Sequence, residues 1–319
     1  MTLERLFLAP GGSLTAHREQ SDRFAHAMSA ATRPTGLILG TILAILLIAS
    51  LQFAFIALQL LLPPDVVQDG GLVLASFCFL PIWAVLWVWL RLKEGRPFAT
   101  IGFSQRAHAP FLLLRGAGIA FAAMTLIVGI GVLTGNLAFR ANADGTLIDW
   151  SSLGWVIVAI LAFAIQGGAE ELTTRGYLFQ VWFRRTGLIG SVIAQTVFFT
   201  LVHGANTGFS ILPAVSLVAV AVLLCFWALA EGGLWGPLAF HGIWNWSQGL
   251  FFGISVSGNE ISHSLFHVAA TEGSSPAVSG GDFGAEGSAV TCVVLALLAG
   301  VAIAAFVRVR RASVVRSAA

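Results

Sequence analysis

The sequence predicts an all-α, polytopic bundle of about eight membrane-spanning helices, with both ends of the chain in the cytoplasm. Hydrophobic residues make up 57% of the 319 residues and charged residues only 10%, and the mean hydropathy is +0.87. Water-soluble domains usually carry about 25% charged residues, which solvate their surface. Apolar runs of about 18 or more residues recur along the chain, and the cations fall almost entirely between alternate runs.

The same composition excludes several other classes of protein. The net charge is only +2 and no basic run alternates with aromatic residues, so a nucleic-acid partner is not expected. The apolar content excludes a disordered chain, and three cysteines are too few for a disulfide scaffold. The first 35 residues are polar and contain no apolar run typical of a signal peptide. The chain is therefore expected to be embedded in a lipid bilayer.

The predicted helices follow from length. A helix rises about 1.5 Å per residue and the hydrocarbon core is about 30 Å thick, so about twenty apolar residues cross it. The eight predicted spans are 36–62, 72–90, 112–135, 153–183, 188–205, 211–230, 236–253 and 288–307. Pro63-Pro64 ends the first span, and Gly232-Gly233 separates the sixth from the seventh. The chain is thus expected to comprise a cytoplasmic segment 1–35, a transmembrane domain 36–307 and a basic cytoplasmic tail 308–319.

The distribution of the cations predicts the orientation, because cationic loops resist translocation. Of the 17 Lys and Arg residues, fifteen fall in segments predicted to be cytoplasmic: 1–35, 91–115, 184–185 and 308–316. Arg140 lies outside, and Arg175 lies within a span. The long loop 254–287, predicted to lie outside, contains no Lys or Arg. An odd number of spans would place the basic tail on the wrong side, so an even number is expected.

Three of the predicted spans contain polar groups that are costly in a membrane. An ionisable side chain there costs at least about 2.5–3.5 kcal/mol on insertion scales, so each one needs a partner or a function. Glu170, Glu171 and Arg175 lie in the fourth span, His203 lies in the fifth, and His241 and Asn245 lie in the seventh.

The two adjacent carboxylates of the fourth span are expected to differ. Glu171 and Arg175 are four residues apart, so they share a helix face and can pair. For that pair, a purely structural ion pair and a role in a site are about equally expected. Glu170 points about 100° away from Glu171, because a helix has about 3.6 residues per turn. It lacks a local cation, so we expect it to find a donor or a metal, or to serve as a base.

Chain geometry predicts that the polar groups of the three spans meet. Glu170 and His203 are almost equally far from a predicted turn at 184–187, so an antiparallel hairpin brings them to one level. His241 and Asn245 share one face of their helix. If about 13 Å of the fourth span protrudes into the cytoplasm, all three motifs meet about a third of the way in from that side. The irregular segment 204–210 then lies at membrane depth, which requires protein or a water-filled cavity around it.

In this order the residues resemble a known family. Glu170-Glu171 with Arg175 fits E-E-x-x-x-R, Phe199 with His203 fits F-x-x-x-H, and His241 with Asn245 fits H-x-x-x-N. Together they are similar to the CPBP intramembrane proteases, which include type II CAAX prenyl endopeptidases and bacterial proteins linked to bacteriocin self-immunity. The resemblance covers about 153–253 and extends more loosely to a glycine-rich loop at 280–287.

The resemblance implies a peptidase mechanism. Glu170 would be the general base that activates a water held by His203, and His241 and Asn245 would stabilise the oxyanion. Supporting roles would fall to Glu171, Arg175 and Phe199. The alternative is a zinc ion bound by Glu170, His203 and His241. The usual zinc-protease motif H-E-x-x-H is absent from the sequence, so a zinc site and a metal-free site both stay open.

The expected activity is that of a membrane-embedded endopeptidase in the inner cell membrane. Its active site would open toward the cytoplasmic side and accept a peptide or a segment of a membrane protein. Two other functions stay open. A proton- or ion-coupled transporter also uses buried Glu and His, but it usually shows repeated halves, and none is visible here. A catalytically silent immunity or scaffold protein is less favoured, because every motif position is filled.

Overall fold

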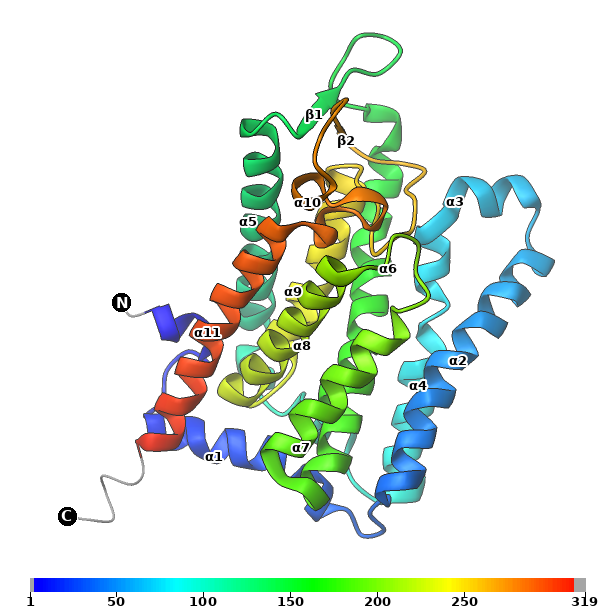
Figure 1. Ribbon diagram of the computed structural model, residues 1–319. Helices are drawn as coiled ribbons and strands as arrows, with labels where there is room; N and C mark the ends of the chain where they lie inside the picture. Colours follow the sequence, from blue (N-terminus) through cyan, green and yellow to red (C-terminus); the bar gives the residue numbers. More distant parts are fainter. Residues whose placement is uncertain (1–2, 313–319) are drawn as a thin grey trace.

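The computed structural model describes residues 3–312, which form a helical bundle with a short two-stranded ribbon at one end (Figure 1). The helices are α1 (Leu14–Ala25), α2 (Leu37–Leu61), α3 (Pro64–Phe77), α4 (Leu80–Val88), α5 (Ala109–Leu133), α6 (Leu153–Glu171), α7 (Phe179–Val202), α8 (Ile211–Glu231), α9 (Trp235–Trp246), α10 (Pro276–Ser279) and α11 (Ala289–Arg311). Strands β1 (Leu137–Arg140) and β2 (His267–Ala270) pair antiparallel. Turns of π-helix extend α4, α6 and α9 over Trp89–Glu94, Leu172–Leu178 and Ser247–Phe251.

Within the described residues, six helical runs are long and apolar enough to cross a membrane. They are Leu37–Leu61, Pro64–Glu94, Arg106–Leu133, Trp150–Val202, Ile211–Glu231 and Ala289–Arg311. The all-α membrane bundle is therefore confirmed, whereas the predicted number of eight separate spans is not. The fourth and fifth predicted spans share the run Trp150–Val202. The seventh is formed by α9 and the π-helical turn after it, which together are shorter than the other spans.

The chain reverses direction within the run Trp150–Val202. Gly187 has φ 67° and ψ −161°, outside the helical region, and the ribbon turns back at this end of α7 (Figure 1). A straight helix would separate Glu170 from His203 by about 50 Å. Their side chains instead lie 3.9 Å apart. Glycine tolerates positive φ at little cost, so the predicted hairpin turn at 184–187 forms at its glycine.

Helix α9 lies at the centre of the bundle, packed against α5 and α6. Its side chains Phe240 and Trp244 are buried. Two glycines allow the close contact with α6. A Cβ atom at Gly167 would lie 2.9 Å from the backbone nitrogen of Gly242, and one at Gly242 would lie 3.0 Å from the backbone oxygen of Phe163. Small residues let membrane helices approach closely, and here they bring the polar residues of α6 and α9 together.

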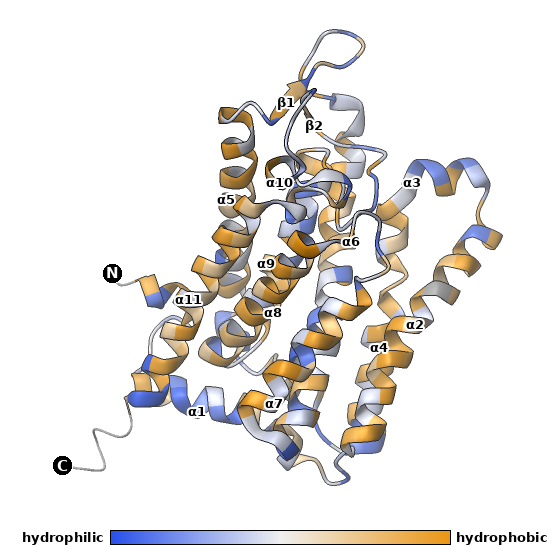
Figure 2. Ribbon diagram, viewed as in Figure 1, coloured by the Kyte–Doolittle hydropathy of each residue, from blue (hydrophilic) through white to orange (hydrophobic). Residues whose placement is uncertain are grey.

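The surface of the bundle is apolar along its sides and polar at its ends, as Figure 2 shows. Helix α2 is the clearest case, with Ile38 and Leu60 exposed to 74% and 81%. Such exposure is costly in water and favourable in lipid. The basic end of α11 lies beside α1 at one end of the bundle, and the ribbon β1–β2 lies at the other (Figure 1).

The polar N-terminal segment is folded against the bundle. Phe7 and Met28 are fully buried, and α1 packs across the ends of α8 and α11. Only a cytoplasmic segment was expected here, because its apolar residues form no long run. At the other terminus, α11 continues to Arg311, so the predicted tail 308–319 begins inside a helix. Residues 313–319 of that tail lie outside the described residues.

Candidate active site

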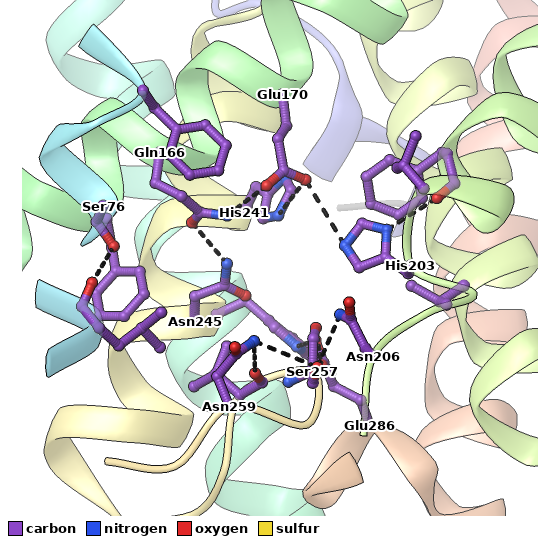
Figure 3. Close-up of a pocket in the computed structure, with 18 of the residues that line it drawn as sticks. Ser76, Gln166, Glu170, His203, Asn206, His241, Asn245, Ser257, Asn259 and Glu286 are labelled. Atoms are coloured by element: carbon purple, nitrogen blue, oxygen red, sulfur yellow. Dashed lines mark hydrogen bonds and ion pairs between the residues drawn. The ribbon is translucent and has the colours of Figure 1, made fainter. Parts of the chain in front are cut away.

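The four residues predicted to be catalytic lie around one cavity of about 420 Å³. Glu170 comes from α6, His203 follows α7, and His241 and Asn245 come from α9 (Figure 3). The structure thus brings residues of three separate helices together, as the spacing of the motifs predicted. Apolar side chains complete much of the wall, including Phe163 of α6, so the polar groups face a largely apolar space.

Glu170 presents one unpaired carboxylate oxygen to the cavity. Its Oε1 accepts a hydrogen bond from Gln166 Nε2 at 2.5 Å, whereas its Oε2 is buried and accepts none. That oxygen lies 3.9 Å from Nε2 of His203 and 3.9 Å from Nε2 of His241. These separations are too long for direct hydrogen bonds. The three atoms therefore face a common space in the cavity.

His203 is held in one orientation by the end of its own helix. Its Nδ1 lies 2.8 Å from the backbone oxygen of Phe199, one turn earlier. A carbonyl oxygen can only accept, so Nδ1 carries the proton in this contact. In the neutral ring Nε2 is then unprotonated and directed toward Glu170. The F-x-x-x-H spacing thus supplies both the carbonyl and, through the Phe199 ring 4.7 Å away, a packing surface for the imidazole.

The second carboxylate, that of Glu171, lies behind the site and contacts one of its imidazoles. Glu171 Oε1 accepts from Arg175 Nη1 at 3.0 Å and from His241 Nδ1 at 2.8 Å, and both members of the ion pair are fully buried. The guanidinium of Arg175 also lies over the ring of Phe199, 4.2 Å from its centre. Sequence analysis left a purely structural pair and a role in the site open. The contact with His241 places this pair directly behind the site.

Gln166 was not identified from the sequence. It accepts from Asn245 Nδ2 at 2.9 Å through its own oxygen and donates to Glu170 through its nitrogen, so it joins the two residues. The sequence offered one indication of this role: Gln166 lies four residues before Glu170, on the same helix face. An uncharged polar residue in a span is less conspicuous than an ionisable one, which is why it was missed.

The loop after α9 forms another wall of the cavity. Glu286 Oε1 accepts from Trp244 Nε1 at 3.0 Å, and its Oε2 accepts from the backbone nitrogen and the hydroxyl of Ser257 at 2.9 and 2.6 Å. Asn206, in the irregular segment after His203, donates to the backbone oxygen of Ser257 at 2.8 Å. Ser257 has φ 47°, a strained value for a residue with a side chain. The loop is therefore fastened to α9, which carries His241, and to the segment that follows His203.

This wall bears on the predicted opening of the site. Residues 256–259 and Glu286 belong to the loop 254–287, which the charge distribution places outside. The segment 204–210 breaks its helix beside the cavity, as predicted, with Asn206 on the wall. The opening toward the cytoplasmic side stays a prediction, since the described cavity wall includes the opposite loop.

The predicted zinc ligands do not form a metal cluster in the part of the chain that the structure describes. No group of three His, Cys, Asp or Glu side chains there is placed to hold a metal ion. Two atoms bonded to one tetrahedral zinc at about 2.0–2.2 Å lie about 3.4 Å apart. The two separations at Glu170 are 3.9 Å. Binding of a zinc ion by these three residues would require each of the two separations to shorten by about 0.5 Å.

Comparison with known families gives one match. Residues 152–247 match the family model described as Rce1-like, type II CAAX prenyl endopeptidase Rce1-like. The chain carries an Rce1-like segment. This confirms the resemblance inferred from the three motifs, and all seven motif residues predicted for the site lie within the segment. No curated protein and no solved structure matches the chain. The Rce1-like match indicates a CAAX-type intramembrane protease.

Proposed function

We propose that the protein is an intramembrane endopeptidase that hydrolyses a peptide bond of a membrane-associated peptide or protein. One observation carries the proposal: the buried, unpartnered Oε2 of Glu170 faces Nε2 of both His203 and His241 at 3.9 Å. Atoms at this separation can be bridged by one water molecule that hydrogen-bonds to both. A carboxylate in that position can take a proton from the water as it attacks.

The reaction needs only the side chains of the cavity. The water oxygen bonds to the carbonyl carbon of the substrate while Glu170 accepts the released proton. The resulting tetrahedral intermediate breaks its C–N bond, and the proton passes from Glu170 to the leaving amine. Water supplies both the new carboxylate oxygen and this proton, so no further reactant is required. His203 fixes the water through Nε2, with Nδ1 engaged on Phe199.

The oxyanion is stabilised from the side of α9. His241 Nδ1 is engaged with Glu171, so Nε2 can donate to an oxyanion only when the imidazole is protonated. The bond from Nδ1 to Glu171 leaves Nε2 as the nitrogen that faces the cavity, which gives the ion pair behind the site a part in orienting the imidazole. Asn245 uses one amide hydrogen on Gln166 and has a second available. Preorganised donors of this kind are usually worth about 10²–10³ in kcat each.

The setting of the reaction belongs to the same proposal. The bilayer supplies the surroundings of the apolar helices, and the charge distribution favours an orientation with both chain ends in the cytoplasm. We place the protein in the inner cell membrane as part of this proposal. The alternative chemistry uses a zinc-bound water, and measurements of zinc content and of the rate after chelation distinguish it from the metal-free reaction. We expect no stoichiometric zinc in the purified protein and an unchanged rate after chelation, because the acidic and imidazole groups are spaced for water.

The test uses the full chain in detergent with a panel of internally quenched apolar peptides. We expect wild type to cleave at least one peptide and Glu170→Gln to be slower by at least about 10²–10⁴-fold, since it removes the base but keeps the shape. Glu272→Gln, on an exposed loop, is the matched control and should cleave as wild type does. If wild type cleaves no peptide but conducts protons in liposomes, the result contradicts the proposed peptidase activity and favours a transporter. If purified wild type contains bound zinc and His203→Ala does not, the metal-free mechanism is wrong and a zinc-bound water takes its place.

A further inference from the structure

Glu286 belongs to none of the three sequence motifs, yet it is buried at the wall of the active-site cavity. Both of its carboxylate oxygens accept hydrogen bonds. Oε1 accepts from Nε1 of Trp244, next to Asn245 on α9, and Oε2 accepts from the backbone nitrogen and the hydroxyl of Ser257. All of these donors are uncharged. Burying an acidic group without a cation costs free energy, which indicates a function for Glu286 beyond filling space.

The turn that Glu286 holds is strained. Ser257 has φ 47°, and it is the only non-glycine residue with a positive φ among the residues that the structure describes. A residue with a Cβ atom adopts this conformation only where its surroundings hold it there. Here one carboxylate oxygen accepts both from the backbone nitrogen and from the hydroxyl of Ser257. We therefore expect the turn to relax when this acceptor is lost.

The strained turn rests on the segment that follows His203. The backbone oxygen of Ser257 accepts from Nδ2 of Asn206 at 2.8 Å. The backbone nitrogen of Asn206 in turn donates to the backbone oxygen of His203 at 3.1 Å. The two backbones also lie in direct contact, because a Cβ atom at Gly258 would overlap the backbone oxygen of Thr207. A movement of the turn is thus passed to the residues directly after His203.

His203 needs this support because it lies just past the last residue of α7. The bond from its Nδ1 to the backbone oxygen of Phe199 orients the ring, but the backbone of His203 is no longer inside the helix. Its Nε2 lies 3.9 Å from Oε2 of Glu170, and a displacement of about 1 Å at a reacting group can cost about 10²-fold in rate. Figure 3 shows Ser257 and Glu286 together, across the cavity from Glu170.

We propose that Glu286 is a positioning residue for the hydrolysis: through Ser257 and Asn206 it holds His203 at its distance from Glu170. The inference rests on the proposed peptidase function, and it gives Glu286 no contact with the substrate. The functional unit then extends beyond the matched segment 152–247 to the glycine-rich loop before α11.

The test measures kcat of the full chain in detergent, with the enzyme in excess over the peptide that wild type cleaves best. Glu286→Gln keeps the size of the side chain, but an amide nitrogen cannot accept, so the new side chain can serve Trp244 or Ser257 and not both. We expect kcat to fall by at least about tenfold. Asp282→Asn, at an exposed position of the same loop, is the matched control and should stay within about twofold of wild type. An unchanged kcat in Glu286→Gln would overturn the inference.

A second comparison separates positioning from a general loss of stability. In a His203→Ala background no imidazole is left to position, so adding Glu286→Gln should lower kcat by less than about threefold. A loss of tenfold or more in both backgrounds would show that Glu286 does not act through His203. Asn206→Ala removes the last link of the same chain of contacts and should give the same pattern. It takes the place of Glu286→Gln if that variant does not fold.

Hydrogen exchange followed by mass spectrometry tests the structural step independently of activity. We expect Glu286→Gln to raise the exchange rate of the segment 203–210 by at least about tenfold over wild type, and Asp282→Asn to leave it unchanged. The wild-type rate in Glu286→Gln would contradict the inference. If wild type cleaves none of the peptides, the proposed function fails, whereas raised exchange in this segment still supports the link from Glu286 to His203.

Discussion

At the scale of single residues, the two adjacent buried carboxylates of α6 differ in their partners, and Glu171 resembles two other buried carboxylates of the described chain. Glu94, Glu171 and Glu231 each form an ion pair with an arginine. Glu170 faces two imidazoles instead, and one of its oxygens has no hydrogen bond. Adjacent positions on α6 thus hold one carboxylate that is bonded to an arginine and one with an oxygen free to contact a water or a substrate, and the proposed mechanism uses the second.

The ion pair behind the site should be essential for stability. We expect Arg175→Met to lower the free energy of unfolding by about 3–5 kcal/mol, because it leaves the charge of Glu171 buried without its guanidinium. The midpoint of SDS-induced unfolding of the purified protein measures this. Arg184→Met, at an exposed position, is the control. The double variant Glu171→Gln/Arg175→Met should recover part of the loss, and a wild-type midpoint for Arg175→Met would show that the pair adds nothing.

At the scale of elements, the approach of α6 to α9 sets the distance between Glu170 and His241. Both helices present a glycine at the contact. We expect Gly167→Val to lower kcat/KM by at least about tenfold while the protein stays folded, because a displacement of about 1 Å at a reacting group can cost 10²-fold. Gly154→Val, on the same helix with open space around it, should leave the rate unchanged. Equal rates for the two variants would mean that this contact does not position the site.

The start of the long helical run offers a prediction on pH. Asp149 accepts hydrogen bonds from the hydroxyls of Ser151 and Ser152 and from the Ser151 backbone nitrogen, and these bonds, the Ser151 hydroxyl foremost, lower the pKa of its carboxyl. A lowered folded-state pKa adds stability above the unfolded value of about 3.9, and this stability disappears as the pH falls through the folded value. We expect wild type to lose its advantage over Asp149→Asn only below about pH 4. A difference in unfolding midpoint that stays constant from pH 7 to pH 3 would contradict this.

At the scale of the whole molecule, hydropathy and charge were sufficient to predict the helical membrane bundle, because both follow from the solvent that surrounds it. The hairpin turn and the meeting of Glu170 with His203 were also predictable, since distance along a helix converts directly into depth. Gln166 and Glu286 were not, because the role of an uncharged or loop residue depends on which neighbours folding brings to it. The buried N-terminal segment escaped prediction for the same reason: Phe7 and Met28 lie in apolar stretches that are too short to predict burial.

The orientation of the whole molecule can be tested with single cysteines in a background that lacks Cys78, Cys225 and Cys292. We expect Ala277→Cys, in the exposed part of the loop 254–287, to react with a membrane-impermeant maleimide in intact cells. Ser29→Cys, exposed at the basic end, should react only after the membrane is opened. The reverse pattern of labelling would place the cationic end outside and would refute the predicted topology.

The most direct test of the account is a double-mutant cycle on Glu170 and His203, measured as kcat/KM for the best peptide substrate. Residues that act on one water lose their function together, so we expect the double variant Glu170→Gln/His203→Ala to be no slower than the slower single variant, within about threefold. Losses that multiply in the double variant would show that the two side chains act on separate steps, and the shared hydrated site would have to be abandoned.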